Sequence, residues 1–263
     1  MYKIIAFDID GTILPYGDKE FSNEVHEMFA ELKRKGYIVA FVTGREFVTI
    51  ADLINTPNID YFLGANGAFV YDMKTKENIF EKSVPFEDFK KIDDFCLENK
   101  INLSAITQKS VYFKEKECYK DDKFWKDFYN RIKVMDYEEI SNEKIHQIII
   151  RTSNSKIQKN IIDFANTIPG VSVNTIWDKG MFIGPEGVHK ASGLEKLCEI
   201  ENIKMSEIIA FGDGMNDKTM LKEVGMGIAM GIAKKEVREM ANDGCDTATN
   251  FGTIKKLKEM NIL

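Results

Sequence analysis

The chain has 263 residues, enough for one elaborated domain or two modest ones. Its composition, 44% hydrophobic and 30% charged, is that of an ordinary soluble globular protein. The formal net charge of -6 argues against broad binding to nucleic acid or to anionic membranes, because both require a basic surface. We therefore expect neither a nucleic-acid partner nor a membrane partner.

The cysteines and the apolar runs indicate the cellular compartment of the protein. Cys96, Cys118, Cys198 and Cys245 form no CxxC pair, so reduced thiols are expected in place of a zinc site or a disulfide framework. The first apolar run is short and is cut off by acids, and no other run approaches the roughly 18 residues of a membrane span. These features predict a cytoplasmic protein.

Short apolar runs alternate with an amphipathic helix in the first part of the chain. Ile4–Phe7 is a run typical of a strand that is buried on both faces of a parallel sheet. An apolar stripe at helical spacing follows Ser22 and stops at Gly36, which predicts a helix. Residues 37–42 and 61–63 predict two more strands. Alternating strands and helices are typical of an open α/β sheet.

The middle of the chain has longer, more amphipathic and more charged segments. Its pattern predicts two helix–strand–strand units, at residues 86–98, 102–107 and 111–114, and at residues 157–166, 171–176 and 181–183. Residues 114–139, rich in charges and aromatics, are expected to be helical and to connect the two units. We therefore predict an inserted α+β domain over residues 84–187.

The alternation of strand and helix returns after Gly187. A helical stripe runs from Leu194 to Ile200, and apolar strands follow at residues 207–211 and 226–230. The expected fold class is α/β, with a Rossmann-like parallel sheet core. Both ends of the chain contribute to this core, namely residues 1–83 and 188–263.

Polar residues follow the strands of the predicted core. In open α/β sheets, ligands bind beyond the carboxyl ends of the strands, so we expect these side chains to converge. The polar and small residues at four strand ends are Asp8, Asp10, Gly11, Thr12, Thr43, Gly44, Arg45, Asn66, Asp213, Asn216 and Asp217.

Four acids in one crevice repel one another. Two unit charges about 4 Å apart cost roughly 4 kcal/mol at an effective dielectric constant near 20. A hard divalent cation relieves this repulsion, and Mg²⁺ prefers oxygen ligands. A carboxylate can also attack phosphorus and form an aspartyl phosphate, a role that suits Asp8. Asp10 could then protonate the leaving oxygen and deprotonate the hydrolytic water.

A phosphate substrate needs compensating donors. Thr43 and the Gly44 amide offer hydrogen bonds, and Asn216 could add one more. Lys190 offers a full positive charge just before a predicted helix, where the backbone N–H groups also favour phosphate. Most of what phosphoryl transfer requires of a protein is such positioning and charge neutralisation.

The motifs resemble those of a known superfamily. DIDGT, VTGR, the lysine in GVHKASGLEKL, and GDGMND followed by ML and GIAMG look like the four motifs of the haloacid dehalogenase-like (HAD) superfamily. The large insertion between the second and third motifs resembles the Cof-type phosphatases with an α+β (C2B-type) cap. The motifs span Asp8 to Ala248, so the resemblance covers essentially the whole chain.

The resemblance implies a Mg²⁺-dependent phosphatase that hydrolyses small phosphomonoesters, either sugar phosphates or cofactor phosphates, through an aspartyl phosphate. It implies Asp8 as nucleophile and metal ligand, and Asp213 as a further metal ligand. Asp10 would be the acid–base and would bind the metal through its main-chain carbonyl. The phosphate-contacting positions of the family correspond to Thr43, Gly44, Lys190 and Asn216. Asp217 corresponds to a supporting acid near the metal.

Two residues depart from the family pattern. Ala191 follows the lysine where glycine is common, which is harmless to the chemistry. Ile232 stands where the family usually has asparagine, near the expected rim of the cap. This second departure weakens any assignment of a specific substrate.

Several further residues have two readings. Asn66 supplies either a left-handed turn or a substrate contact, and Arg45 either pairs with an acid or touches substrate. Trp177 and Lys179 lie at the tip of an expected hairpin that faces the active site in cap-bearing relatives, so both are candidate specificity residues. His189 is expected to be an exposed neighbour of the lysine and not a base.

Two other functions remain open. A phosphosugar mutase could share the nucleophile and the cap but would return the phosphoryl group to a sugar. A non-catalytic phosphometabolite-binding protein could retain the fold. The expected partner is a small phosphorylated metabolite, and the expected assembly is a monomer or a small homo-oligomer. The sequence does not identify the substrate.

Overall fold

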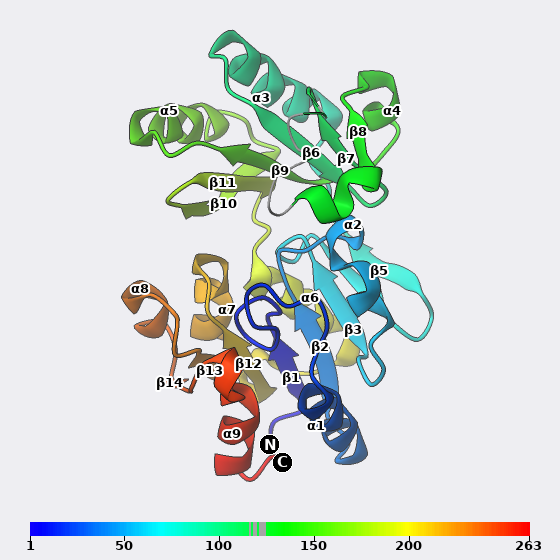
Figure 1. Ribbon diagram of the computed structural model, residues 1–263, viewed down its shortest axis with the longest axis vertical. Coiled ribbons are helices and arrows are strands. Elements are labelled where there is room, and N and C mark those ends of the chain that lie inside the picture. Colours follow the sequence, from blue (N-terminus) through cyan, green and yellow to red (C-terminus); the bar gives the residue numbers. More distant parts are fainter. Residues whose placement is uncertain (116, 118–119, 121–124) are drawn as a thin grey trace. The chain divides into compact units, whose positions relative to one another are not determined.

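The chain folds into two compact units. The structure is a computed structural model that describes residues 1–115, 117, 120 and 125–263 (Figure 1). The first unit contains residues 1–44, 52–81 and 189–263, and the second contains residues 45–51 and 82–188. The short segment 45–51 follows residues 1–44 of the first unit in the sequence but belongs to the second unit, which the sequence pattern did not indicate.

An eight-stranded sheet forms the centre of the first unit, in the order β14-β13-β12-β1-β2-β3-β4-β5. Its strands are β1 (Ile4–Phe7), β2 (Ile38–Val42), β3 (Tyr61–Gly64), β4 (Phe69–Asp72), β5 (Glu77–Glu81), β12 (Ile208–Gly212), β13 (Met226–Ala229) and β14 (Asp243–Gly244). Neighbouring strands from β14 to β3 are parallel, which confirms the predicted Rossmann-like core. Strands β4 and β5 extend one edge in antiparallel fashion. The sequence pattern did not predict these two.

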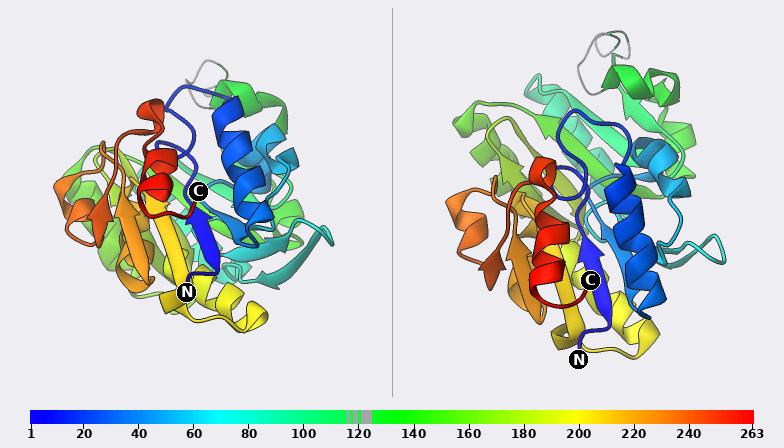
Figure 2. Two further views of the ribbon diagram at one scale, coloured as in Figure 1. Left: turned by 90° about the horizontal axis from the view of Figure 1, so that it is seen from below. Right: turned by 60° about the horizontal axis from the view of Figure 1, so that its bottom comes forward.

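Helices cover both faces of this sheet. They are α1 (Asn23–Arg34), α6 (Lys190–Glu201), α7 (Lys218–Glu223), α8 (Lys235–Arg238) and α9 (Gly252–Glu259). α1 and α9 lie on one face, and α6 on the other (Figure 2). The side chains of β1 alternate accordingly, because Phe7 packs edge-on against Phe29 of α1 whereas Ile4 belongs to the cluster that contains Leu194 of α6. β1 is therefore buried on both faces, as its continuous apolar run predicts.

The second unit contains a six-stranded sheet in the order β10-β11-β9-β6-β7-β8. Its strands are β6 (Leu103–Thr107), β7 (Val111–Phe113), β8 (Ile132–Val134), β9 (Ile145–Arg151), β10 (Val171–Trp177) and β11 (Gly180–Pro185). Its helices are α2 (Phe47–Ile50), α3 (Phe86–Glu98), α4 (Tyr137–Ser141) and α5 (Ser155–Ala165). The rings of Phe95 in α3 and Phe164 in α5 stack 4.2 Å apart.

The two predicted helix–strand–strand units are present as α3-β6-β7 and α5-β10-β11. The prediction for residues 114–139 is wrong at residues 132–134, which form β8. Their main chain pairs with β7, so a long-range partner decides their conformation. Residues 125–131 form a 3-10 helix, and residues 116, 118–119 and 121–124, with Cys118, lie outside the described residues.

Candidate active site

The carboxyl ends of the central strands bring the predicted site residues to one edge of the sheet. Asp8 follows β1, Thr43 follows β2 and Asp213 follows β12. The amide of Asp8 continues the parallel ladder by donating to the Phe211 carbonyl at 2.9 Å. Because these strands are adjacent and parallel, their ends meet, as the sequence pattern predicts.

Lys190 is the centre of a buried ion-pair network. Its ammonium nitrogen lies 2.6 Å from Asp8 Oδ1 and 2.6 Å from Asp217 Oδ1, and the lysine is fully buried. Burial alone would lower the pKa of Lys190, but the charges of Asp217 and Asp8 outweigh it and raise the pKa above its ordinary value. The lysine therefore stays charged and holds one oxygen of Asp8 in place.

The start of α6 fixes the position of this lysine. His189 is the N-cap, and its Nδ1 accepts a hydrogen bond from the Ser192 amide at 3.1 Å. The Ser192 hydroxyl accepts in turn from the His189 amide at 3.0 Å, which completes a capping box. His189 thus works as a helix cap in this structure, and its ring Nδ1 is an acceptor and not a proton donor.

Asp217 organises the loop that carries Asp213. While Oδ1 binds Lys190, Oδ2 accepts from the Asp213 amide at 3.0 Å and from the Gly214 amide at 2.7 Å. A Cβ on Gly212 would lie 2.5 Å from Cγ of Asp217, so no side chain fits at that position. Both oxygens of Asp217 are engaged in holding the loop and the lysine.

Two hydroxyl groups bind the carboxylate of Asp213. The buried Thr12 hydroxyl donates to Oδ1 at 3.2 Å, and the Tyr16 hydroxyl donates to Oδ2 at 2.8 Å. Gly11, in the same loop as these two residues, has a φ of +80°, and a Cβ there would lie 2.6 Å from Asp213 Oδ2. Glycine is required here both by the backbone conformation and by the space.

Three carboxylates form a cluster suited to a cation. Oxygens of Asp8, Asp213 and Asp217 lie within 4.8 Å of one another. Burial raises the pKa of Asp8 well above its usual value, against the opposing effect of Lys190, and the nearby acids raise it further. Burial, followed by the charge of Asp217, raises the pKa of Asp213 to about 6. The positive charge of Lys190 therefore does not fully compensate the charges of Asp8 and Asp213. Carboxylate oxygens are also the ligands that a hard divalent cation prefers.

The phosphate-side residues also gather at this edge. The Thr43 carbonyl accepts from the Asn66 amide at 2.9 Å, and Asn216 Nδ2 donates to Asn66 Oδ1 at 2.9 Å. A Cβ on Gly44 would lie 3.3 Å from that Asn66 oxygen, so the glycine passes close to the pair. Asn66 has a φ of +58° and is buried, so it both makes the turn after β3 and orients Asn216.

Other predicted residues fall outside this cluster. Asp10 is half-buried in the loop after β1, its main chain forms an isolated bridge with Leu14, and its carboxylate is not one of the three clustered ones. Arg45, Trp177 and Lys179 belong to the second unit. Arg45 Nη1 donates to the Thr49 carbonyl at 2.9 Å, and the Trp177 ring packs 4.6 Å from that of Phe182. Lys179 occupies the turn between β10 and β11.

The sequence pattern did not indicate a role for Tyr16. Its contact with Asp213 joins residues 197 positions apart, and no local spacing signals it. Thr12 was visible as part of the motif, but its bond to Asp213 was not predicted.

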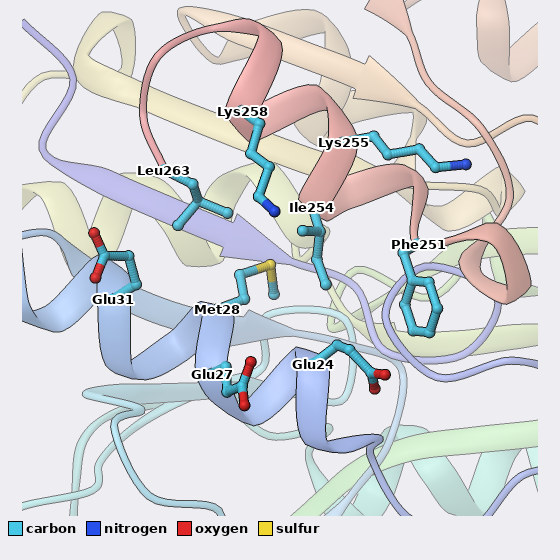
Figure 3. A pocket seen from close by; sticks show the side chains of 9 residues that line it. All are labelled: Glu24, Glu27, Met28, Glu31, Phe251, Ile254, Lys255, Lys258 and Leu263. Atoms are coloured by element: carbon cyan, nitrogen blue, oxygen red, sulfur yellow. The ribbon is translucent and has the colours of Figure 1, made fainter.

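A separate groove in the first unit lies between α1 and the C-terminal helix α9 (Figure 3). Its volume is about 600 Å³. The groove is lined by Glu24, Glu27, Met28, Glu31, Phe251, Ile254, Lys255, Lys258 and Leu263. None of the clustered carboxylates or phosphate-side residues lines it, so it is not part of the candidate active site.

Comparisons with known proteins show a similarity of sequence and fold. A family model described as haloacid dehalogenase-like hydrolase matches residues 5–257. The chain is 29% identical over 260 residues to the 5-amino-6-(5-phospho-D-ribitylamino)uracil phosphatase YcsE of Bacillus subtilis (strain 168). That alignment covers 97% of this chain and 94% of the relative.

Two solved structures share the fold. BT1666 from Bacteroides thetaiotaomicron, one of the phosphatases of the haloalkanoate (HAD) enzyme superfamily, has a TM-score of 0.86 at 25% identity, over 100% of this chain and 96% of its own. The HAD subclass IIB sugar phosphatase BT4131 has a TM-score of 0.86 at 25% identity, over 99% of this chain and 100% of its own. Within the described residues, no helix has the length and apolar character needed to cross a membrane.

Proposed function

The chain belongs to the haloacid dehalogenase-like hydrolases, and from that premise we propose that it is a Mg²⁺-dependent phosphatase of small phosphomonoesters. The observation that carries the proposal is the Lys190 ammonium held 2.6 Å from both Asp8 and Asp217, beside Asp213. Such a network positions one carboxylate as a nucleophile and supplies charge for a phosphate. The phosphatase named among its relatives and the sugar phosphatase among its structural neighbours support the same reaction class.

In the first half of the reaction, Asp8 attacks phosphorus. Lys190 holds Oδ1, so we assign the attack to Oδ2. The new bond joins this oxygen to phosphorus, while the bond from phosphorus to the leaving oxygen breaks. That oxygen takes a proton from Asp10, which we assign as the general acid. Thr43, the Gly44 amide and Asn216 would hold the phosphate oxygens.

In the second half, water hydrolyses the aspartyl phosphate. Asp10 now accepts a proton from the water as its oxygen attacks phosphorus, and the bond to Asp8 breaks. Inorganic phosphate leaves, and both carboxyl groups return to their starting protonation states. Asp217 takes no proton in this scheme. It holds Lys190 and the loop of Asp213 in place.

The residues present fit a divalent cation. Asp8, Asp213 and the main-chain carbonyl of Asp10 would hold it, while Asp217, which binds Lys190 and two loop amides, would support these ligands. When bound, Mg²⁺ would neutralise the charge of the phosphate and of the acids around it.

The second unit would act as a cap that selects the leaving group, and Arg45, Trp177 and Lys179 remain candidate substrate contacts. We place the substrates among sugar phosphates and cofactor phosphates. The relatives support this range, because one is named for a phosphoribitylamino-uracil and another for sugar phosphates.

The test is phosphate release from a panel of sugar and cofactor phosphates, with and without Mg²⁺, by wild type and Asp8→Asn. Release that requires Mg²⁺ and is lost in Asp8→Asn supports the proposal. Sugar phosphate isomerised without phosphate release would identify a mutase. Binding of phosphate compounds without turnover, by a folded and metal-loaded protein, would identify a binding protein.

A further inference from the structure

Tyr16 places its hydroxyl on a carboxylate oxygen of the candidate cation site. The residue lies in the loop after β1, and its hydroxyl donates to Asp213 Oδ2 at 2.8 Å. Tyr16 as a whole is 67% exposed, so its ring lies at the surface while its hydroxyl reaches inward. Because most of the residue is already exposed, an outward rotation of the side chain would uncover little buried surface.

The hydroxyl faces the acids that the proposed function assigns to the cation. The hydroxyl donates to Asp213, and an oxygen of Asp213 lies within 4.8 Å of one of Asp8. Both acids are expected to hold Mg²⁺. The hydroxyl hydrogen therefore supplies partial positive charge in the same region where the cation's charge is expected.

The loop is shaped to admit this contact. A Cβ on Gly11 would lie 2.7 Å from a ring carbon of Tyr16 and 2.6 Å from Asp213 Oδ2. Only the absence of a side chain at this position lets the ring lie across the loop with its hydroxyl on the carboxylate. Asp213 Oδ1 accepts from the buried Thr12, and Oδ2 is the oxygen for which the tyrosine and a cation would compete.

We propose that the Tyr16 hydroxyl binds Asp213 Oδ2 in place of the cation. It is hydrogen-bonded to this oxygen in the cation-free protein and is displaced outward when Mg²⁺ binds. The inference rests on the proposed function, because it takes the carboxylate cluster to be a Mg²⁺ site. Tyr16 is then a positioning residue, since it acts through Asp213 and touches no substrate. Each binding event must break its charge-assisted hydrogen bond, so the tyrosine weakens the apparent affinity for the cation.

The test is titration of Mg²⁺ into the full chain by calorimetry, with wild type, Tyr16→Phe and, as matched control, Tyr2→Phe. Tyr2 precedes β1, at the end of the strand away from the carboxylates. We expect Tyr16→Phe to bind Mg²⁺ about tenfold more tightly, as one lost charge-assisted hydrogen bond implies. Tyr2→Phe should match wild type. Unchanged or weaker binding by Tyr16→Phe overturns the inference.

A second measurement follows the side chain directly. In protein labelled with fluorotyrosine, the fluorine NMR signal that Tyr16→Phe removes is that of Tyr16. We expect this signal to shift when Mg²⁺ is added, and a signal that does not move while Mg²⁺ binds refutes the displacement. If wild type itself binds no Mg²⁺, the cation requirement of the proposed function fails instead, so the two failures are distinguishable.

Discussion

Substitution of Lys190 by methionine would remove the charge that joins two buried acids. The substitution keeps most of the side-chain volume, but Asp8 and Asp217, each 2.6 Å from the ammonium in the wild type, would lose their shared partner. Removing one partner of a buried ion pair costs about 3–5 kcal/mol. We expect the cation-free variant to lose about this much of its unfolding free energy, a large share of the roughly 5–15 kcal/mol of an ordinary protein.

The loss should depend on pH with a definite sign. Burial already raises the pKa of Asp8, and without the lysine its pKa rises further. An acid whose pKa is higher in the folded than in the unfolded chain binds more protons when folded, so ionisation destabilises the fold as the pH rises. The loss caused by Lys190→Met should therefore be smaller near about pH 5 than near about pH 8.

Urea unfolding followed by circular dichroism, in the presence of a chelator, measures both effects. Lys196→Met is the matched control, because Lys196 lies in the same helix and pairs with Glu199 at the surface. It should change the unfolding free energy by no more than about 0.5 kcal/mol. A Lys190→Met variant as stable as this control would refute the reasoning, and so would a variant whose loss of unfolding free energy is larger at the lower pH.

Two further predictions concern Asp213 and its loop. Gly11→Ala should destabilise the protein by about 1–3 kcal/mol, because a Cβ there meets Asp213 at 2.6 Å and the backbone has a φ of +80°; a thermal midpoint equal to that of wild type would contradict this. In the cation-free protein, Asp213 has a pKa of about 6, above that of an unfolded aspartate. Between about pH 4 and about pH 6 the folded state therefore keeps a proton that the unfolded state has released, so stability should fall as the pH rises through this range. The fall amounts to at most about 3 kcal/mol, Asp213→Asn should reduce it, and an equally steep pH dependence in that variant would count against the assignment.

The convergence at the sheet edge was predictable because it follows from strand direction. A continuous apolar run before Asp8 indicates a strand buried on both faces, and parallel neighbours place Thr43 and Asp213 beside it. The motif that contains Lys190 placed it at a helix start, and the capping box of His189 with Ser192 shows how that start is fixed.

Other features depend on contacts that no local pattern encodes. The bond from Tyr16 to Asp213 is made by a long side chain reaching across a glycine, and β8 becomes a strand because β7 offers it backbone partners. The sequence pattern of residues 132–134 alone favoured a helix. The sequence-based prediction therefore missed strand pairing between distant segments and hydrogen bonds made by long side chains across the fold.

The most direct test of the central claim is transfer of a radiolabelled phosphoryl group from substrate to protein. Wild type and Asp8→Asn would be quenched in acid during turnover with Mg²⁺, and the labelled peptide would be identified after proteolysis. The proposed mechanism predicts label on the peptide that contains Asp8 in wild type and none in Asp8→Asn. Phosphate release without labelled protein at any quench time, or undiminished release by Asp8→Asn, would contradict it.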